Sequence, residues 1–305
     1  MKVLLTGAGG FVGQQVLQLL QQQGIATVAI GRRCPRGLGP AQFHPVDLLA
    51  APALATVLQA CGATHLLHLA WETEHGAYWE SPRNLRWVDA SLRLVEAFAA
   101  AGGRHVVVAG SCAEYDWGGD GVCVEGKTPL RPASLYGVAK DTTRNLLQGC
   151  AERCKLGFAW GRVFFPFGAG EDAHRLLPSL VAALLGHVPP FGVSALARRD
   201  FLPVTDVASA LLALLQTQAT GAYNVSSGAA TPIAEIVGLV ADQLGADART
   251  ILRLPAQRTG GPELLLGNNR RLRALGWQPR GDLASALRVA VAQLVAAKAV
   301  QTDVH

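Results

Sequence analysis

Tyr136 and Lys140 are the residues whose types and spacing point most directly to chemistry. They lie four positions apart, which on a helix places both side chains on one face. A tyrosine exchanges a proton readily at neutral pH only if its pKa falls below its ordinary value of about 10. A lysine ammonium one helical turn away favours the phenolate. The pair therefore predicts a tyrosine acid/base whose pKa is lowered by its lysine neighbour.

A second signal is Ser111, because a tyrosine and a lysine at this spacing also occur by chance on surface helices. Ser111 follows the apolar run 105–109, which we expect to be a strand. Ligands meet an open parallel sheet at the carboxyl ends of its strands. We therefore expect Ser111 to hydrogen-bond the reacting oxygen beside Tyr136, and we take Ser111, Tyr136 and Lys140 as the candidate catalytic residues.

A glycine cluster near the N-terminus predicts a turn that binds phosphate. Gly7, Gly10 and Gly13 recur at every third position, and Phe11 and Val12 begin a segment of helical period. Glycine is needed where the chain turns tightly, where the backbone approaches a pyrophosphate, and where a helix packs closely on a sheet. The helix would direct its free N–H groups at the phosphates, so we expect Phe11 and Val12 to bind the cofactor together with the three glycines. Strand, turn and helix together predict a dinucleotide site.

The end of the second expected strand, 26–30, indicates which dinucleotide binds. NAD sites usually place Asp or Glu here, but this sequence has no acidic residue before Asp47 and continues into Arg32 and Arg33. Guanidinium groups pair well with phosphate dianions, so we expect NADP(H), with NAD(H) as the alternative. The arginines could also be solvated or stack on adenine. Asp47 and Leu48 are expected beside the adenine, although Asp47 could instead cap the next helix.

The hydrophobic pattern predicts the scaffold that brings these residues together. Expected strands at 3–5, 26–30, 65–70, 105–109 and 158–164 alternate with expected helices at 11–23, 84–101 and 136–155. Such alternation is typical of a parallel sheet covered on both faces. We expect an α/β fold: a Rossmann-type doubly wound parallel sheet with a smaller, interwoven C-terminal α/β substrate lobe. The sheet would comprise residues 1–167 with returning segments near 200–226, and the lobe mainly residues 168–305.

The second half of the chain is expected to be mostly helical. Helices are predicted at 176–185, 206–217 and 283–300, with a short strand at 222–225. Another helix should begin with Thr231 as its N-cap and Pro232 in its first position.

With these motifs in place, the chain resembles the extended short-chain dehydrogenases/reductases, the NAD-dependent epimerase/dehydratase group. TGAGGFVG from Thr6, HLA from His68 and SCAEY from Ser111 are similar to segments of that family. The similarity continues in YGVAK from Tyr136, RDFLPVTDVA from Arg199, YNVSSG and LGWQP. This similarity extends over nearly the whole chain and rests on all of these motifs together.

The resemblance implies roles for particular residues. Ser111, Tyr136 and Lys140 would be the catalytic triad, and Tyr136 and Lys140 would also contact the cofactor. Leu69 and Ala70 would border the cofactor as well. Ser111 would touch the substrate, which the family implies to be a nucleotide-diphosphate sugar held in the C-terminal lobe.

Further residues are expected at the substrate. Arg199 and Arg258 match cationic positions that meet the substrate pyrophosphate, although both could instead be solvated arginines of the lobe. Cys112 follows the catalytic serine. Trp71 stands where the family usually has a small residue, so its loop either walls the sugar pocket or packs as ordinary structure. Phe165 replaces an asparagine of the family pattern. These departures leave the particular substrate open.

Within this family several reaction types compete. A 4,6-dehydratase usually carries an Asp-Glu pair after the catalytic hydroxyl, whereas Cys112 and Ala113 stand here and Glu114 is displaced. An epimerase recycles bound NAD, which agrees poorly with the arginines after the second strand. We therefore expect a reductase of a 4-keto-6-deoxy nucleotide sugar. The alternatives are an NAD-recycling 4-epimerase and a non-catalytic dinucleotide sensor.

Bulk composition excludes other classes of function. The net charge is +5, and basic residues do not gather into the stripe typical of nucleic-acid binders. The 6 cysteines lack the spacing of a zinc site, so no metal is expected and the thiols should be reduced. We find no signal segment or membrane span, and expect a cytoplasmic protein. By resemblance we expect a homodimer formed through the helix that carries Tyr136 and Lys140.

Overall fold

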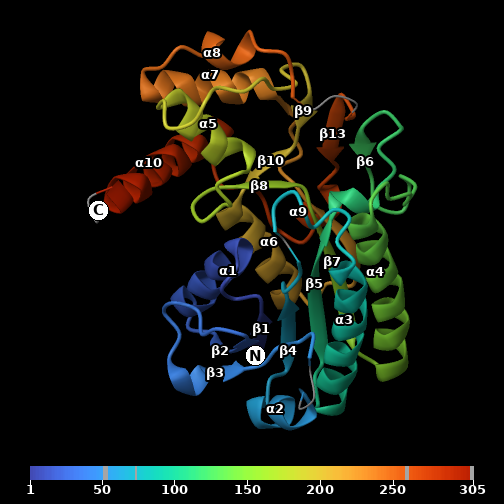
Figure 1. Cartoon of the computed structure of the whole chain (residues 1–305). Coiled ribbons are helices and arrows are strands. Elements are labelled where there is room, and N and C mark those ends of the chain that lie inside the picture. The colour runs from blue at the N-terminus through green and yellow to red at the C-terminus, as the bar shows by residue number, and fades with distance from the viewer. Residues whose placement is uncertain (51–53, 73, 258–260, 303–305) are drawn as a thin grey trace.

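Seven parallel strands form the central sheet of the computed structural model, which describes residues 1–50, 54–72, 74–257 and 261–302 (Figure 1). Their order is β11-β7-β5-β4-β1-β2-β3. The strands are β1 (Lys2–Thr6), β2 (Ala26–Gly31), β3 (Phe43–Pro45), β4 (His65–His68), β5 (His105–Ser111), β7 (Gly157–Val163) and β11 (Gly221–Val225). The strand order reverses at β1, which pairs with β2 on one side and β4 on the other. A ligand crevice is expected at the carboxyl end of such a switch point.

Helices cover both faces of this sheet. One face carries α1 (Phe11–Gln22) and α6 (Val204–Gln216), and the other carries α2 (Leu54–Cys61), α3 (Arg83–Ala100) and α4 (Leu135–Cys154) (Figure 1). In β1, Val3 and Leu5 enter the core below α1 and α6, whereas Leu4 enters the core below α3 and α4. Successive side chains of a strand point to opposite faces, so a strand covered on both sides must be apolar throughout.

The C-terminal lobe has a separate apolar core. Its helices are α5 (Leu176–Leu184), α7 (Ile233–Leu244), α8 (Arg249–Leu252) and α10 (Leu283–Thr302). Leu180, Val240 and Val291 are fully buried where three of these helices meet. A short helix, α9 (Arg270–Arg273), returns to β11. Among the described residues, no helix has both the length and the apolar composition needed to cross a membrane.

Two small sheets join the lobe to the body. One pairs β8 (Phe165–Phe167) with β10 (Phe201–Pro203). The other runs in the order β12 (Thr231–Pro232), β9 (Arg198–Arg199), β13 (Leu264–Gly267), β6 (Val122–Cys123). Strands from the first half of the chain therefore pair with strands from the second half, and the lobe is interwoven with the body.

A buried carboxylate links these returning segments. Asp200 accepts hydrogen bonds from the Ser227 backbone (2.7 Å) and hydroxyl (2.6 Å), and from the backbone N–H groups of Gly228 and Gly267 (3.1 Å each). Burial raises the pKa of Asp200 to about 6, although these donors act in the opposite direction. Asp200 thus holds the β9–β10 junction against the turn after β11 and the end of β13.

The predicted fold class is confirmed, and one helix start was wrong. Thr231 does not cap a helix: it pairs with Arg199 in the antiparallel bridge between β12 and β9. The helix begins at Ile233, with Pro232 in the N-cap position and without a side-chain capping bond. Strand pairing across the lobe therefore prevailed over the local capping signal.

Candidate active site

The glycine turn after β1 has the geometry of a dinucleotide cradle. Gly7 has a φ of +71°, and a Cβ there would lie 2.7 Å from the backbone nitrogen of Ala70. A Cβ at Gly13 would collide with the carbonyl oxygen of Gly7, whereas one at Gly9 would meet nothing within 4 Å. The helix α1 begins at Phe11 without a side-chain cap. The backbone is thus held close to the sheet, and the uncapped helix N-terminus suits an anion such as a pyrophosphate.

Leu69 and Ala70 border this turn through a network that the sequence did not reveal. The Thr6 hydroxyl accepts hydrogen bonds from the N–H groups of Leu69 and Ala70 (3.2 Å each) and lies 2.7 Å from His68 Nδ1. His68 Nε2 lies 2.9 Å from the Ser91 hydroxyl, which donates to the backbone. Burial lowers the pKa of His68 to about 3, so the ring is neutral. A neutral histidine thus fixes the edge of the cradle.

Ser111, Tyr136 and Lys140 lie together at the carboxyl end of the sheet, and we call them the Ser–Tyr–Lys cluster. Ser111 ends β5, and its side chain is hydrogen-bonded to the Tyr136 hydroxyl. Lys140 is 4% exposed, and its Nζ donates to the carbonyl of Ala109 at 2.9 Å. The Tyr136 N–H donates to the carbonyl of Trp79 at 2.9 Å, which fixes the first turn of α4. The structure therefore brings the three sequence-predicted residues into one place.

The electrostatics of this cluster differ from the sequence expectation. Burial raises the pKa of Tyr136 above its ordinary value, and the hydrogen bond from Ser111 opposes this only in part. The sequence predicted the opposite direction. Lys140 is directed at the Ala109 carbonyl, and its Nζ lies 5.9 Å from the centroid of the Tyr136 ring. Burial also lowers the pKa of Lys140 to about 7. Tyr136 therefore keeps its proton at neutral pH.

Glu114 is fully buried in an ion pair behind the cluster. Its carboxylate accepts from Arg162 Nε (2.6 Å), Trp160 Nε1 (2.9 and 3.0 Å) and the Ser111 N–H (2.7 Å). Arg162 also donates to the Tyr115 hydroxyl at 3.3 Å. Every oxygen of this carboxylate is engaged, so Glu114 orients Ser111 and is poorly placed to transfer protons. The sequence showed Glu114 as a displaced acid but gave no sign of its partners.

Trp71 lies against Lys140. Its side chain is largely buried, and Lys140 Nζ sits 3.8 Å from the centroid of its ring. The indole N–H donates to Asn84 Oδ1 at 2.9 Å, and the ring stacks on Trp87 with centroids 6.0 Å apart. The sequence left open whether this residue walls a pocket or packs as ordinary structure. The contact with Lys140 was not anticipated.

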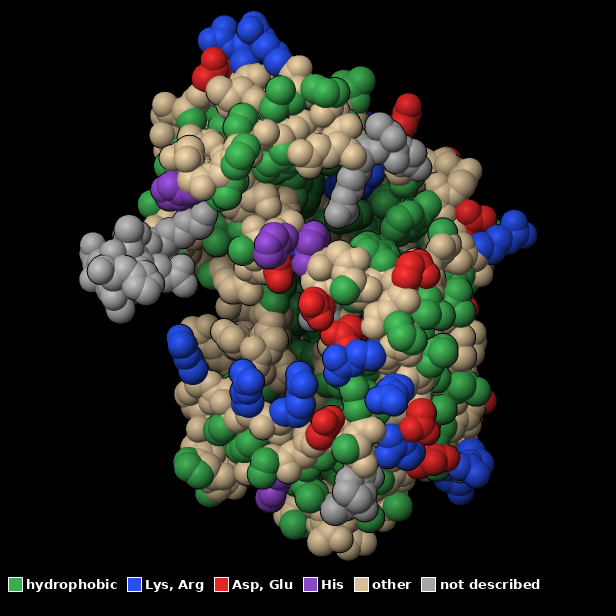
Figure 2. Space-filling view, viewed as in Figure 1, with side chains coloured by type: hydrophobic (Ala, Val, Ile, Leu, Met, Phe, Trp, Pro, Cys, Tyr) green, Lys and Arg blue, Asp and Glu red, His purple; other side chains and the backbone are tan. Residues whose placement is uncertain are grey.

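The rest of the loop after β4 closes over the cluster. The rings of Tyr78 and Trp79 make T-shaped contacts with the ring of Tyr136, with centroids 4.9 and 5.7 Å away. His75 stacks on His174, from the loop after β8, with centroids 6.3 Å apart. Figure 2 shows histidine side chains at the mouth of the hollow between the body and the lobe. Two loops distant in sequence therefore meet at the opening of the site.

The substrate candidates in the lobe are only partly assembled around the cluster. The Arg199 guanidinium lies 5.8 Å from the centroid of the Phe165 ring and donates to two backbone carbonyls. Burial lowers the pKa of Arg199, and the Cys112 thiol acts in the opposite direction. Cys112 is itself buried, which raises its pKa. Arg258 lies outside the described residues. Arg199 and Cys112 thus approach the same space beside Phe165.

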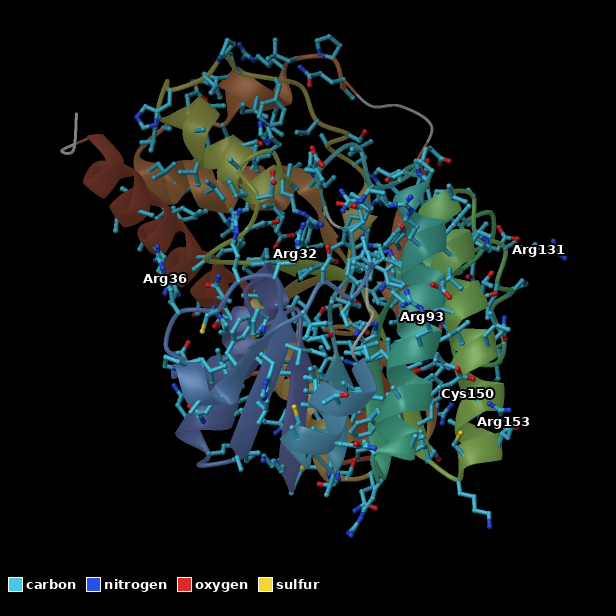
Figure 3. All side chains as sticks on the ribbon, turned by 60° about the horizontal axis from the view of Figure 1, so that its bottom comes forward. Arg32, Arg36, Arg93, Arg131, Cys150 and Arg153 are labelled. Carbon is cyan, nitrogen blue, oxygen red and sulfur yellow. The ribbon has the colours of Figure 1, made fainter. Side chains whose placement is uncertain are left out.

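The expected determinants of cofactor choice lie at the surface. Thr6 pairs with Ile30 in the parallel register, so Arg32 and Arg33 follow the strand next to the glycine turn. Both are exposed, and we call them the arginine rim. Figure 3 shows Arg32 facing the space toward the lobe.

Asp47 and Leu48 lie in the turn after β3. Asp47 is exposed, and its carboxylate accepts from the N–H of Leu49 at 3.0 Å, so it closes its own turn. Leu48 is 4% exposed and belongs to the core below α3 and α4. Asp47 therefore remains available at the surface, whereas Leu48 contributes mainly to packing.

Comparison with known proteins agrees with this geometry. Residues 3–226 match the model of the NAD dependent epimerase/dehydratase family. The chain is 23% identical to UDP-glucose 4-epimerase 2 of Arabidopsis thaliana, with 92% of this chain and 91% of that protein covered. It is 24% identical to dTDP-6-deoxy-L-talose 4-dehydrogenase (NAD(+)) of Aggregatibacter actinomycetemcomitans, with 75% and 85% covered.

A solved structure of MoeE5 in complex with UDP-glucose and NAD superposes with a TM-score of 0.84 at 28% identity, covering 98% of this chain and 100% of that one. The fold and the match to the family model define an enzyme of the short-chain dehydrogenase/reductase type. The chain belongs to the NAD dependent epimerase/dehydratase family, as its motifs predicted.

Proposed function

We propose that this protein is an NAD(P)(H)-dependent oxidoreductase that acts on a nucleotide-diphosphate sugar and reduces a 4-keto-6-deoxy sugar. The observation that carries the proposal is the Ser–Tyr–Lys cluster, in which the Tyr136 hydroxyl is hydrogen-bonded to Ser111 beside the buried Lys140. Support for the substrate class comes from the relatives, whose names refer to UDP- and dTDP-sugars.

Each residue of the cluster has a distinct role in this proposal. When bound, the nicotinamide supplies the hydride that reduces the carbonyl carbon. The Ser111 hydroxyl donates a hydrogen bond to the carbonyl oxygen of the substrate and so orients this carbonyl. Tyr136 transfers its proton to the alkoxide as charge develops there. Lys140 stabilises the resulting phenolate and holds the ribose of the cofactor.

The protonation state of Tyr136 favours the reductive direction. Reduction needs a proton donor; a phenol at its ordinary pKa of about 10 is already protonated at neutral pH, and burial raises the pKa of Tyr136 further. Dehydration is disfavoured because Cys112 and Ala113 follow Ser111 and because the Glu114 carboxylate is held by Arg162. The dTDP-6-deoxy-L-talose 4-dehydrogenase among the relatives agrees with redox chemistry at a deoxysugar.

The cofactor is proposed to be NADP(H). The arginine rim follows β2, and no acidic residue occurs in the sequence before Asp47. A guanidinium can pair with a 2′-phosphate, whereas the ribose hydroxyls of NAD would lack an acidic acceptor. The glycine turn accepts either dinucleotide.

A second candidate is an NAD-recycling 4-epimerase. It is favoured by the relatives named as UDP-glucose 4-epimerases and by the NAD in the MoeE5 complex. An epimerase needs Tyr136 as a base before it acts as an acid, so it would require the bound cofactor to lower the pKa of that phenol.

We also propose that the protein forms a homodimer through α3 and α4. Large apolar side chains are exposed on both helices: Leu85 (59%) on α3, and Val138 (44%) and Leu146 (47%) on α4. Figure 1 shows the two helices side by side along one flank of the body. Burial of these side chains against a second copy would remove their apolar surface from water.

The test begins with cofactor binding by the purified protein. NADPH should bind more tightly than NADH, and a 4-keto-6-deoxy nucleotide sugar should then oxidise NADPH in equal amounts. Tightly retained NAD with interconversion of unmodified UDP-sugars would establish the epimerase instead. Tight binding of NADPH with no reduction of any sugar nucleotide would favour the non-catalytic sensor.

A further inference from the structure

The side chain of Lys140 is enclosed where an ammonium has few means of stabilisation. It is 4% exposed, and its hydrogen-bond acceptor is the carbonyl of Ala109. Glu114, the nearby carboxylate, is neutralised by its 2.6 Å contact with Arg162. Removing an ammonium from water without a free counter-ion favours its neutral form. Something else must offset this loss if Lys140 is to act as a cation.

The face of the Trp71 indole lies beside the Lys140 ammonium, in the place that a free counter-ion would take. Lys140 Nζ lies 3.8 Å from the centroid of that ring, compared with 5.9 Å for Tyr136 and 6.0 Å for Trp160. The electron-rich face of an indole attracts a cation, and the attraction grows when water is excluded. We propose that Trp71 is a positioning residue that holds Lys140 as an ammonium beside Tyr136 through a cation–π contact. Only its effect on turnover rests on the proposed function.

The Trp71 indole is held in place by two contacts. Its N–H donates to Asn84, a fully buried residue whose amide donates to the carbonyls of Tyr78 (2.7 Å) and Ser81 (3.0 Å). Its ring also stacks on the ring of Trp87, with centroids 6.0 Å apart. A side chain fixed in this way loses little further freedom in holding the ammonium, so the contact is preorganised. A sugar-binding wall would not need the ring to face Lys140.

Other groups that face Lys140 provide too little of this stabilisation to offset its burial. His68, on β4, is neutral because burial lowers its pKa to about 3. Tyr136 keeps its proton, because its pKa is raised. Glu114 does favour the charged lysine, but burial outweighs it and lowers the pKa of Lys140 to about 7. Losing the indole should therefore move this pKa still lower.

The direct test is an NMR titration of Lys140 in the intact protein. The sequence has only five lysines, so selective labelling with ¹⁵N and ¹³C gives resolvable signals, and Lys140→Arg identifies the relevant one. Site-specific incorporation of mono-, di- and trifluorotryptophan at position 71 preserves the shape of the ring while weakening its electron-rich face. The matched control is the same series at Trp277, which is buried in the body against Ser209.

We expect the pKa of Lys140 to fall with each added fluorine at position 71, by about one unit over the series, and to stay constant for the series at Trp277. A Lys140 pKa unaffected by fluorination at position 71 would overturn the proposal, as would an equal shift in both series. Neither result depends on knowing the substrate.

Conventional variants extend the test to turnover. Trp71→Leu should lower the upper pH limit of reductase activity, and Trp71→Phe should restore part of the shift because it retains an aromatic face. If Trp71→Leu does not fold, the fluorinated series still decides the question. Absence of turnover on any 4-keto sugar nucleotide, with the fluorine effect intact, would reject the proposed function and leave the role of Trp71 standing. Equal pH limits for Leu, Phe and the parent protein would contradict it.

Discussion

The Ser–Tyr–Lys cluster and the arginine rim both lie at the carboxyl ends of strands of the central sheet. The cluster is largely enclosed, whereas the rim is exposed to solvent. In the cluster, Lys140 is 4% exposed and Ser111 is held by an ion-paired Glu114. In the rim, Arg32 and Arg33 are exposed, and no ion pair joins either to an acidic residue in the described part of the chain.

This contrast separates the positions at which geometry must exist before binding from those at which it can form on binding. A proton donor loses its advantage if it must be reoriented during the reaction, so preorganisation is most valuable at the cluster. A surface arginine can remain hydrated in the free protein. Its side chain loses conformational entropy only when a phosphate binds. Mutations in the two regions should therefore differ in kind as well as in size.

The largest effect should come from Tyr136→Phe. Removal of the proton donor should lower kcat by about 10²- to 10⁴-fold and leave the dissociation constant for NADPH nearly unchanged. Steady-state kinetics and a binding titration measure the two quantities. Tyr223→Phe removes a hydroxyl from a tyrosine that stacks on Arg271 away from the cluster, and it should retain activity. Turnover that survives Tyr136→Phe would remove the basis for contrasting the two regions.

Gly13→Ala should be next in size, because it disturbs the cradle that serves both regions. The added Cβ collides with the Gly7 carbonyl. We expect NADPH and NADH to bind about 10- to 100-fold more weakly, judged from the usual cost of overpacking. Calorimetric titration measures this, with a thermal melt to show that the variant folds. Gly9→Ala places a Cβ in open space and should bind both cofactors normally. Similar losses in both variants would contradict the cradle.

A smaller effect is expected from Arg32→Ala at the rim. Loss of a charge-assisted hydrogen bond to the 2′-phosphate should weaken NADPH binding about tenfold and leave NADH binding and kcat unchanged. Arg36→Ala is the control, because Arg36 is also exposed but lies farther along the chain from β2 (Figure 3). An equal loss of binding affinity for NADPH and NADH would mean that Arg32 does not recognise the 2′-phosphate.

The smallest effect should be the response to salt. Exposed charges are screened as ionic strength rises, and buried ones much less. Raising the salt from about 0.05 to 0.5 M should weaken NADPH binding a few-fold and change NADH binding less. The kcat at saturating substrates should stay level, because the cluster is enclosed. A kcat that falls in parallel with NADPH affinity would show that the two regions are not electrostatically distinct.

The sequence predicted those parts of the site that depend on neighbouring residues. Gly7, Gly10 and Gly13 lie between a predicted strand and a predicted helix, which is the local context that indicates the turn. The spacing of Tyr136 and Lys140 places both on one face of a helix. The pKa of Tyr136 could not be predicted in this way, because its direction depends on the loop that closes over the helix. The fold class followed from the alternation of strands and helices.

Contacts between segments that are distant in the sequence could not be predicted from the sequence. Glu114 meets Arg162 across 48 positions, and Tyr115 donates to Asn224 across 109. No local pattern announces such pairs. The same holds for Thr231, whose capping signal was real but was displaced by pairing with Arg199. Trp71 was noticed as a departure, but its partner was visible only once β4 and α4 had been brought together.

The position of β11 has a consequence for biosynthesis. This strand pairs with β7 from Gly221↔Ala159 to Val225↔Val163, so β7 becomes an inner strand only after the chain has grown well past it. On the ribosome, the six strands of this sheet that precede β11 are complete while one side of the apolar strand β7 still lacks a partner. Such edges recruit other chains. We therefore expect the returning strand to reduce aggregation of the nascent protein, whereas a chain that stopped before residue 221 would keep that edge open.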